Sequence, residues 1–270
     1  TLFRSLAGEG VAASAGYPTR EGFLLTMEAR LRALRPASAR DVDELAKSDD
    51  LAWRAEEGRR LLGENTFRAL VRECWGTRQP PFSALHASLV ALPWAHVLTT
   101  SFDPALEHAH VAATSAPPDV VLWNEHANVE ELLARSADPS YRRRYVYLHG
   151  RFDREGIVLA DSELASRYGA DRDRAERLLS LFDRHPGVVV GASLTDTDLA
   201  SFFRRQSAQR ASLPRHFAFL PWPDGSEDLE RRRIQSRYGI DPIFYVGAPE
   251  RVLAWLRARL AVAPVAPTAP

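Results

Sequence analysis

This sequence contains very little cysteine and has no net charge. One cysteine, Cys74, occurs among 270 residues, so neither a disulfide framework nor a four-cysteine zinc site can form within one chain. Lysine plus arginine number 35 and aspartate plus glutamate also number 35, which sets the formal net charge at zero. A free-standing nucleic-acid-binding protein usually carries a basic excess, so we do not expect direct nucleic-acid binding.

Long apolar segments are absent as well. No run approaches the roughly 20 apolar residues of a membrane-spanning helix. Residues 1–10 lack the apolar core and the cleavage site of a signal peptide, so we expect a cytoplasmic location and no membrane contact. With 45% hydrophobic and 26% charged residues, the composition is that of a globular domain.

Four short segments share a pattern that points to a functional site. In 6–16, 97–103, 146–150 and 188–198, apolar or β-branched residues give way to Gly, Ser, Thr, His or Asp. Buried strands of a parallel sheet have this pattern, and the loops at their carboxyl ends meet in one crevice. The first segment also has a glycine-rich turn before an expected helix, which suits a phosphate.

The order of the remaining patterns predicts the fold class. Strands separated by helices imply parallel pairing with crossover connections. We therefore predict an α/β fold: a Rossmann-like parallel sheet with helices on both faces and an inserted helical subdomain. Strands are expected at 2–6, 95–100, 120–123, 145–149, 187–191, 216–220 and 243–246, and helices at 104–113, 162–184, 196–209, 226–238 and 249–260.

The same patterns divide the chain into parts. Apolar residues in 31–92 recur every three or four positions without a convincing strand, which predicts an insertion of three or four helices. Residues 1–30 and 93–261 would form the Rossmann-like domain. Residues 262–270 are rich in Pro and Ala and are interpreted as a linker or tail, so further domains are an open question.

Five motifs in this order resemble those of the sirtuin-like NAD-binding domains of bacterial antiphage-defence proteins. The family's motifs are a GAGVS turn followed by G-x-P, a TTN-x-D segment, an LHG segment, a G-x-S-x-x-D segment and a late G-I-x-x-I-x-Y strand. The matching residues are Gly8-Glu9-Gly10-Val11-Ala12 with Gly16 and Pro18, Thr99-Thr100-Ser101-Phe102-Asp103, Leu148-His149-Gly150, Gly191-Ala192-Ser193 with Asp196, and Gly239-Ile240 with Ile243 and Tyr245.

The resemblance implies that the chain binds NAD. Defence members of the family hydrolyse NAD to nicotinamide and ADP-ribose, often within larger assemblies. Sirtuin deacetylases carry a four-cysteine zinc module, which one cysteine cannot supply, so neither zinc nor deacetylation is expected. The resemblance implies cofactor contacts at Gly8, Gly10, Ala12, Thr100, Gly191, Ser193 and Tyr245.

His149 is the best catalytic candidate in the sequence. It ends a predicted strand just before a glycine, and an imidazole titrates near neutrality, so it could exchange a proton with a ribose hydroxyl. Asp103 would orient a ribose hydroxyl or hold a backbone turn. Ser193 would contact a phosphate or ribose, or cap a helix.

Three residues depart from the family pattern. Glu9 replaces an alanine, Ala12 replaces a serine, and Ser101 replaces the asparagine on which NAD cleavage in the family depends. Ser101 could still organise a water, at a cost in rate. Glu9 could repel a pyrophosphate, stabilise the positive charge that develops on the ribose, or point to solvent or cap a helix.

Two functions therefore remain open. The first is an NAD glycohydrolase of the defence type that uses His149, Ser101, Asp103 and Glu9. The second is a catalytically lapsed module that binds NAD or ADP-ribose, or serves as an assembly surface for another copy or a defence-system partner protein.

Overall fold

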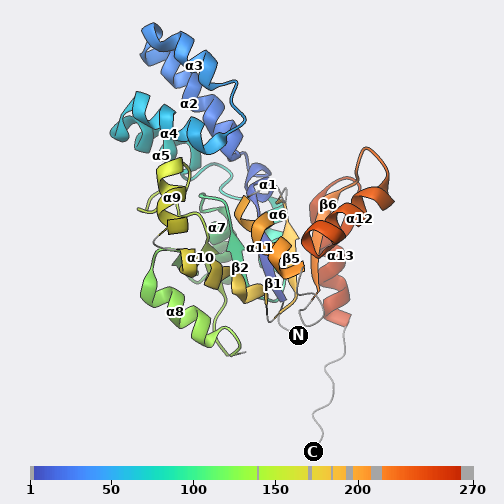
Figure 1. Ribbon diagram of the computed structural model, residues 1–270. Helices are drawn as coiled ribbons and strands as arrows, with labels where there is room; N and C mark the ends of the chain where they lie inside the picture. The colour runs from blue at the N-terminus through green and yellow to red at the C-terminus, as the bar shows by residue number, and fades with distance from the viewer. Residues whose placement is uncertain are drawn as a thin grey trace, which may run out of the picture.

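A seven-stranded sheet forms the centre of the molecule (Figure 1). The computed structural model describes residues 3–138, 140–169, 172–183, 185–192, 197–207 and 215–262. Every pair of adjacent strands in the described part of the chain is parallel, and the strand order is β3-β4-β2-β1-β5-β6-β7. The predicted α/β sheet is confirmed. The strands are β1 (Phe3–Ala7), β2 (Trp94–Thr99), β3 (Asp119–Leu122), β4 (Arg144–Tyr147), β5 (Gly187–Val190), β6 (His216–Pro221) and β7 (Ile240–Tyr245).

Helices connect the strands and add a separate group at one end of the sheet. No helix within the described ranges has the length and apolar character needed to cross a membrane. Two short 3₁₀ helices lie at Pro36–Ser38 and Ser180–Phe182. The α-helices are α1 (Glu9–Ala13), α2 (Arg20–Leu34), α3 (Ala39–Leu45), α4 (Leu51–Leu62), α5 (Glu64–Trp75), α6 (Ala84–Val90), α7 (Ala105–Thr114), α8 (His126–Arg135), α9 (Asp161–Gly169), α10 (Arg172–Leu179), α11 (Thr197–Ser207), α12 (Glu227–Tyr238) and α13 (Pro249–Val262).

Both faces of the sheet are apolar because consecutive side chains on a strand point to opposite sides. On β1, Leu6 belongs to one core cluster and Ala7 to another. Val97 and Leu98 of β2 divide in the same way. One cluster includes residues of α8, α10, α11 and α12, and the other includes residues of α6, α7 and α13. Helices therefore cover both faces, as expected.

A third core joins the helical group α2–α5 to the sheet. Phe23 of α2 stacks on Trp75 of α5 with ring centroids 4.6 Å apart, and Trp75 packs on Phe102, just after β2, at 4.7 Å. The cluster also takes in Leu159 and Ala160, which precede α9. The group projects from the carboxyl edge of the sheet at the top of Figure 1. The division at residues 31 and 92 stays a prediction.

The helix predicted at 162–184 is divided into α9, α10 and the 3₁₀ helix at Ser180–Phe182, and two further elements differ from the sequence prediction. Helix α8 was not predicted; it buries only Val129 and Leu132, so its apolar stripe is short. Strand β7 begins at Ile240 rather than at Ile243 and contains Pro242. β7 is the last strand in the sheet order, and an edge strand accepts a proline because its outer side makes no ladder hydrogen bonds.

Candidate functional site

The carboxyl ends of four neighbouring strands meet at one edge of the sheet. β4, β2, β1 and β5 are adjacent and parallel, and Gly8, Thr100, His149 and Gly191 lie within two residues of their ends. A cleft of about 1810 Å³ opens at this edge. Five of the predicted site residues line it: Glu9, Gly10, Thr100, Gly191 and Tyr245.

The glycines allow two backbone turns to touch. The Gly8 amide donates to Val190 O and the Gly10 amide donates to Gly191 O, both at 2.8 Å. A Cβ on Gly8 would lie 2.4 Å from Gly191 O and one on Gly10 would lie 2.8 Å from the same oxygen. Gly191 itself has a φ of 65°. These two amides are engaged by the β5 turn, so close packing is the role that the geometry gives to Gly8 and Gly10.

His149 lies behind the wall of the cleft. Its carbonyl accepts the Val158 amide at 2.8 Å, and the residue is only 2% exposed. Its Nδ1 atom is 3.1 Å from Nη2 of Arg20, the first residue of α2. Arg20 lines the cleft and His149 does not, so the imidazole meets the cleft through Arg20.

Glu9 is bonded to the same arginine. One carboxylate oxygen accepts the Arg20 backbone amide at 2.8 Å, and the other lies 3.5 Å from Arg20 Nε. Glu9 thus caps the N-terminus of α2 from within the cleft wall, where a negative charge is favoured by the helix dipole. Glu9, Arg20 and His149 form a continuous line of contacts from the glycine turn to the imidazole.

Ser101 and Asp103 are bonded to each other rather than to the cleft. The Ser101 hydroxyl donates to Asp103 Oδ2, and Asp103 Oδ1 accepts the Ala105 amide at 2.9 Å at the start of α7. Tyr147 on β4 donates its hydroxyl to the Asp103 carbonyl at 2.9 Å. Burial raises the pKa of the Asp103 carboxyl. These contacts hold the turn between β2 and α7, which is the alternative that the sequence left open for Asp103.

The other predicted contacts fall in different surroundings. Thr100 donates its amide to Ala7 O at 3.2 Å at the cleft edge, and Tyr245 is the last residue of β7. Burial raises the pKa of the Tyr245 hydroxyl. Ala12 is 2% exposed and packs in the core of the α2–α5 group, so its side chain does not reach the cleft. Ser193 lies outside the described residues.

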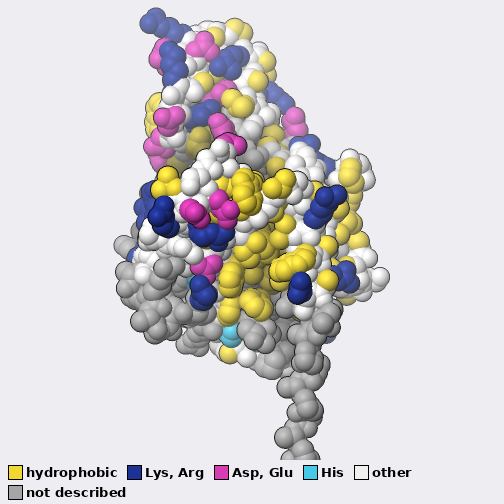
Figure 2. Space-filling view, turned by 90° about the vertical axis from the view of Figure 1, so that its right-hand side faces the viewer, with side chains coloured by type: hydrophobic (Ala, Val, Ile, Leu, Met, Phe, Trp, Pro, Cys, Tyr) yellow, Lys and Arg dark blue, Asp and Glu magenta, His cyan; other side chains and the backbone are white. Residues whose placement is uncertain are grey.

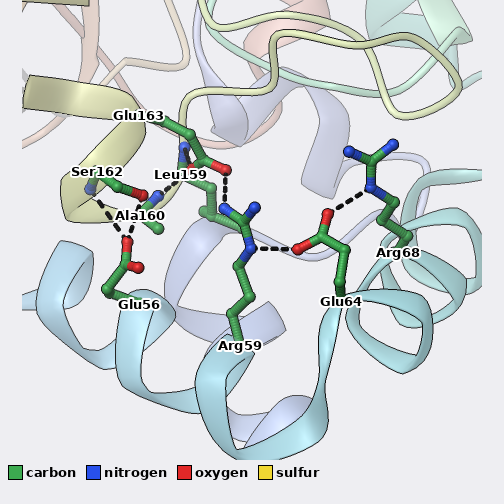
Figure 3. Close-up of polar contacts among 8 residues, drawn as sticks. All are labelled: Glu56, Arg59, Glu64, Arg68, Leu159, Ala160, Ser162 and Glu163. Atoms are coloured by element: carbon green, nitrogen blue, oxygen red, sulfur yellow. Dashed lines mark hydrogen bonds and ion pairs between the residues drawn. The ribbon is translucent and has the colours of Figure 1, made fainter. Parts of the chain in front are cut away.

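The chain that leaves His149 is held by the helical group. The Glu163 carboxylate of α9 accepts the amides of Leu159 and Ala160 at 3.2 and 2.6 Å and pairs with Arg59 of α4 at 2.6 Å. Glu56, one turn earlier on α4, accepts both the amide and the hydroxyl of Ser162 (Figure 3). Helix α4 therefore anchors the far end of the segment 150–160.

Sequence reasoning missed Arg20 and, apart from Tyr245, the aromatic end of the cleft. A signal for Arg20 was present, because Thr19 follows Pro18 and caps α2, which places Arg20 first in the helix beside the glycine turn. At the opposite end of the cleft, Trp222 is 51% exposed and its ring lies 6.3 Å from that of Phe244. Figure 2 shows hydrophobic side chains across the middle of the β6–α12 side, with lysine and arginine side chains beside them.

The donor set of the site favours an organic ligand. Within the described ranges, no three His, Cys, Asp or Glu side chains are grouped so that they could hold a metal ion. The cleft instead offers backbone turns, one guanidinium in contact with a histidine, and aromatic rings. A large mostly pre-formed cavity with a few convergent polar groups is typical of a cofactor or nucleotide site.

Comparison with known proteins identifies the family. The family model of the SIR2-like domain matches residues 95–243, which is more than half of the chain and runs from β2 into β7. The match includes Thr100, His149 and Gly191, and the turn that carries Glu9 and Gly10 precedes it. No curated protein matches the chain. SIR2-like domains bind NAD, and the chain belongs to the SIR2-like family.

Proposed function

We propose that this protein binds NAD in the cleft and hydrolyses it to nicotinamide and ADP-ribose. The observation that carries the proposal is the line of contacts from Glu9 through Arg20 to His149 at the carboxyl edge of a SIR2-like sheet. It supplies an imidazole for proton transfer and a cation for a phosphate within one connected group.

The dimensions and lining of the cleft support a dinucleotide. Its volume of about 1810 Å³ exceeds the roughly 300–1,000 Å³ of a typical small-molecule pocket. Trp222, Phe244 and Tyr245 at one end offer flat surfaces for adenine. The nicotinamide ribose would then lie at the other end, beside Glu9 and Arg20.

The charge of Glu9 is compatible with a pyrophosphate because it is paired. An isolated carboxylate about 4 Å from a phosphate charge would be repelled by roughly 4 kcal/mol at an effective dielectric of about 20. The Arg20 guanidinium, with its Nε 3.5 Å from one Glu9 oxygen, and the Arg20 backbone amide, 2.8 Å from the other, reduce this repulsion. The pair presents a nearly neutral wall with a cation that can turn toward the ligand.

In this proposal each residue has a limited task. His149 accepts a proton from a ribose hydroxyl, and Glu9 faces the side of the cleft on which positive charge develops. The Ser101 hydroxyl donates its hydrogen bond to Asp103, so its oxygen can only accept a hydrogen bond from water. Because that is less than an asparagine amide would provide, we expect slow turnover.

A second candidate function follows from the same contacts. The Ser101 hydroxyl is committed to a buried carboxylate, and Arg20 covers one nitrogen of His149. Such a site could bind NAD or ADP-ribose without turnover and act as a sensor or as an assembly surface. On either reading we propose a role in bacterial antiviral defence, alone or with a partner protein, on the strength of the five ordered motifs.

The experiment compares NAD cleavage by the purified chain and by the His149→Ala variant. Nicotinamide release should fall about 10²–10⁴-fold in the variant if His149 transfers a proton. His126→Ala, which removes an exposed imidazole at the start of α8, is the control. No cleavage in any assembly state, or equal cleavage with and without His149, would overturn the first function. Calorimetric binding of ADP-ribose without turnover would support the second.

A further inference from the structure

Glu9, Arg20 and His149 contact one another in series beside the cleft. The Glu9 carboxylate accepts the backbone amide of Arg20 at 2.8 Å and lies 3.5 Å from Nε of the same residue. The Arg20 Nη2 atom lies 3.1 Å from Nδ1 of His149. The first contact is on the α1 turn and the last is at the end of β4, so two strand ends of the sheet are coupled through one guanidinium.

The geometry makes Glu9 the group that aims Arg20. A guanidinium is planar and rigid, so holding its Nε edge also sets the direction of its Nη2 group. The Glu9 carboxylate is itself fixed, because its second oxygen is bonded to the first amide of α2. Glu9 therefore directs the Arg20 side chain toward His149.

Arg20 in turn sets the hydrogen positions of the imidazole. A guanidinium can only donate hydrogen bonds, so Nδ1 of His149 must accept. A neutral ring that accepts at Nδ1 carries its hydrogen on Nε2. The ring nitrogen on the cleft side is thus covered by Arg20 and has no lone pair available for a ribose hydroxyl.

We propose that Glu9 is a positioning residue that holds Arg20 on His149 while the cleft is empty, and that the pyrophosphate of an entering dinucleotide draws Arg20 off the ring. Nδ1 is then free to accept a proton: the ribose O–H bond breaks, an N–H bond forms, and the electron pair stays on oxygen. This inference rests on the proposed function and adds a ligand-dependent step to it.

The Arg20–Glu9 pair is accessible enough for Arg20 to exchange its contacts for a bound ligand. Side chains of Arg20 and Glu9 keep 18% and 25% of their surface exposed, so water and ligand reach both. A pyrophosphate carries two charges against one on the carboxylate, and arginine binds phosphate oxygens in bidentate geometry. Displacement of Arg20 from His149 therefore needs only a rotation of one side chain toward a stronger anion.

The test uses Glu9→Gln, which keeps an oxygen for the Arg20 amide and removes the charge that holds the guanidinium. We expect ADP-ribose to bind about 10-fold more tightly to this variant, because the negative charge beside the Arg20 guanidinium is removed. The control is Glu21→Gln, which removes the charge of another carboxylate that lines the cleft without touching the line of contacts; the affinity of this variant should change less than about 3-fold.

A second readout needs neither turnover nor ligand affinity. The ¹⁵N shifts of the His149 ring should show an accepting Nδ1 in the ligand-free protein, and addition of ADP-ribose should change the Nδ1 signal. The ligand-free Glu9→Gln variant should already show this change. If its ring signals and its ADP-ribose affinity equal those of the unaltered protein, Glu9 does not position Arg20.

The outcomes separate this inference from the proposed function. A protein that neither binds ADP-ribose nor releases nicotinamide contradicts the proposed function, while the ligand-free ring signals still decide whether Glu9 aims Arg20. A Glu9→Gln variant with a lower kcat and unchanged ring signals would leave Glu9 with charge stabilisation at the ribose alone and would overturn the positioning role.

Discussion

Gly8 illustrates how one missing side chain controls the site. Its Cα lies so close to the β5 turn that an added Cβ would meet Gly191 O at 2.4 Å and Ala192 Cα at 2.5 Å. Both of these atoms belong to the backbone, which cannot rotate away as the end of a flexible side chain can. The turn that carries Glu9 and the turn that carries Gly191 therefore stay in contact only with glycine at this position.

We predict that Gly8→Ala separates the two turns. The cost should be about 1–3 kcal/mol in the free energy of unfolding, as for other overpacked sites, and dinucleotide binding should weaken with it. Urea unfolding and calorimetry measure the two effects. Gly225→Ala is the matched control, because no atom lies within 4 Å of the Cβ it would add. Equal unfolding midpoints for the two variants would contradict the prediction.

At the residue scale, sequence reasoning located strand ends better than side-chain partners. It placed His149, Thr100 and Gly191 at the ends of strands that the structure brings together. It left the direction of Glu9 open, because a side chain one residue into a short helix can turn to solvent, ligand or a neighbouring helix. The partner that decided the outcome, Arg20, is eleven residues away on another helix.

Helix α4 and the start of α9 form the clearest coupling between elements. Arg59 bonds Glu163, and Glu163 in turn accepts two backbone amides at the start of α9 (Figure 3). Burial raises the pKa of Glu163 even though Arg59 and the amides lower it. The carboxylate thus depends on Arg59 for its nearest compensating charge.

We predict that Arg59→Ala destabilises the protein by about 1–2 kcal/mol, a value reduced because both partners are about a quarter exposed. Amide hydrogen exchange at Leu159 and Ala160 should speed up with it. Arg68→Ala is the control, since Arg68 is 52% exposed and pairs with Glu64 at the outer end of the same network; its effect should stay within about 0.5 kcal/mol. Equal effects of the two variants would argue against the coupling.

Elements were predictable from the sequence where their apolar pattern was long or was bounded by glycine and proline. All seven strands of the sheet were expected, because each is a short run with apolar residues that ends near a loop or turn. Helix α8 was not, because two buried residues do not make a periodic stripe. The early start of β7 at Ile240 was missed because a proline argues against a strand until its edge position is known.

Besides His149, three buried histidines lie on different elements of the described part of the molecule, and burial keeps all three neutral. Burial lowers the pKa of His86 on α6 to about 4, of His96 on β2 to about 3 and of His216 on β6 to about 4. Nearby arginines add to the effect at His96. Each ring accepts a backbone amide at Nδ1, so a proton there would break a hydrogen bond.

The lowered pKa values of these histidines make the folded protein less stable in acid. Between pH 6.5 and about 4 the unfolded chain binds protons at these rings and the folded chain does not, so stability falls as the pH falls. Buried Asp103 and Glu163 act in the opposite direction, because their raised pKa lets the folded state bind protons first. The unfolding free energy therefore changes less with pH than the histidines alone would predict. Substituting one histidine shows the contribution of that ring separately.

We predict that His216→Gln reduces this acid sensitivity. Each histidine contributes a slope of about 1.4 kcal/mol per pH unit in the window, so the variant should lose stability less steeply by about that amount between pH 6.5 and 4.5. Glutamine still offers an oxygen to the Gly187 amide, which His216 Nδ1 accepts at 3.0 Å. The measurement is the urea unfolding free energy at half-unit steps of pH. Parallel curves for the two proteins would mean that His216 is not kept neutral by the fold, since removing a ring that titrates alike in both states changes no slope.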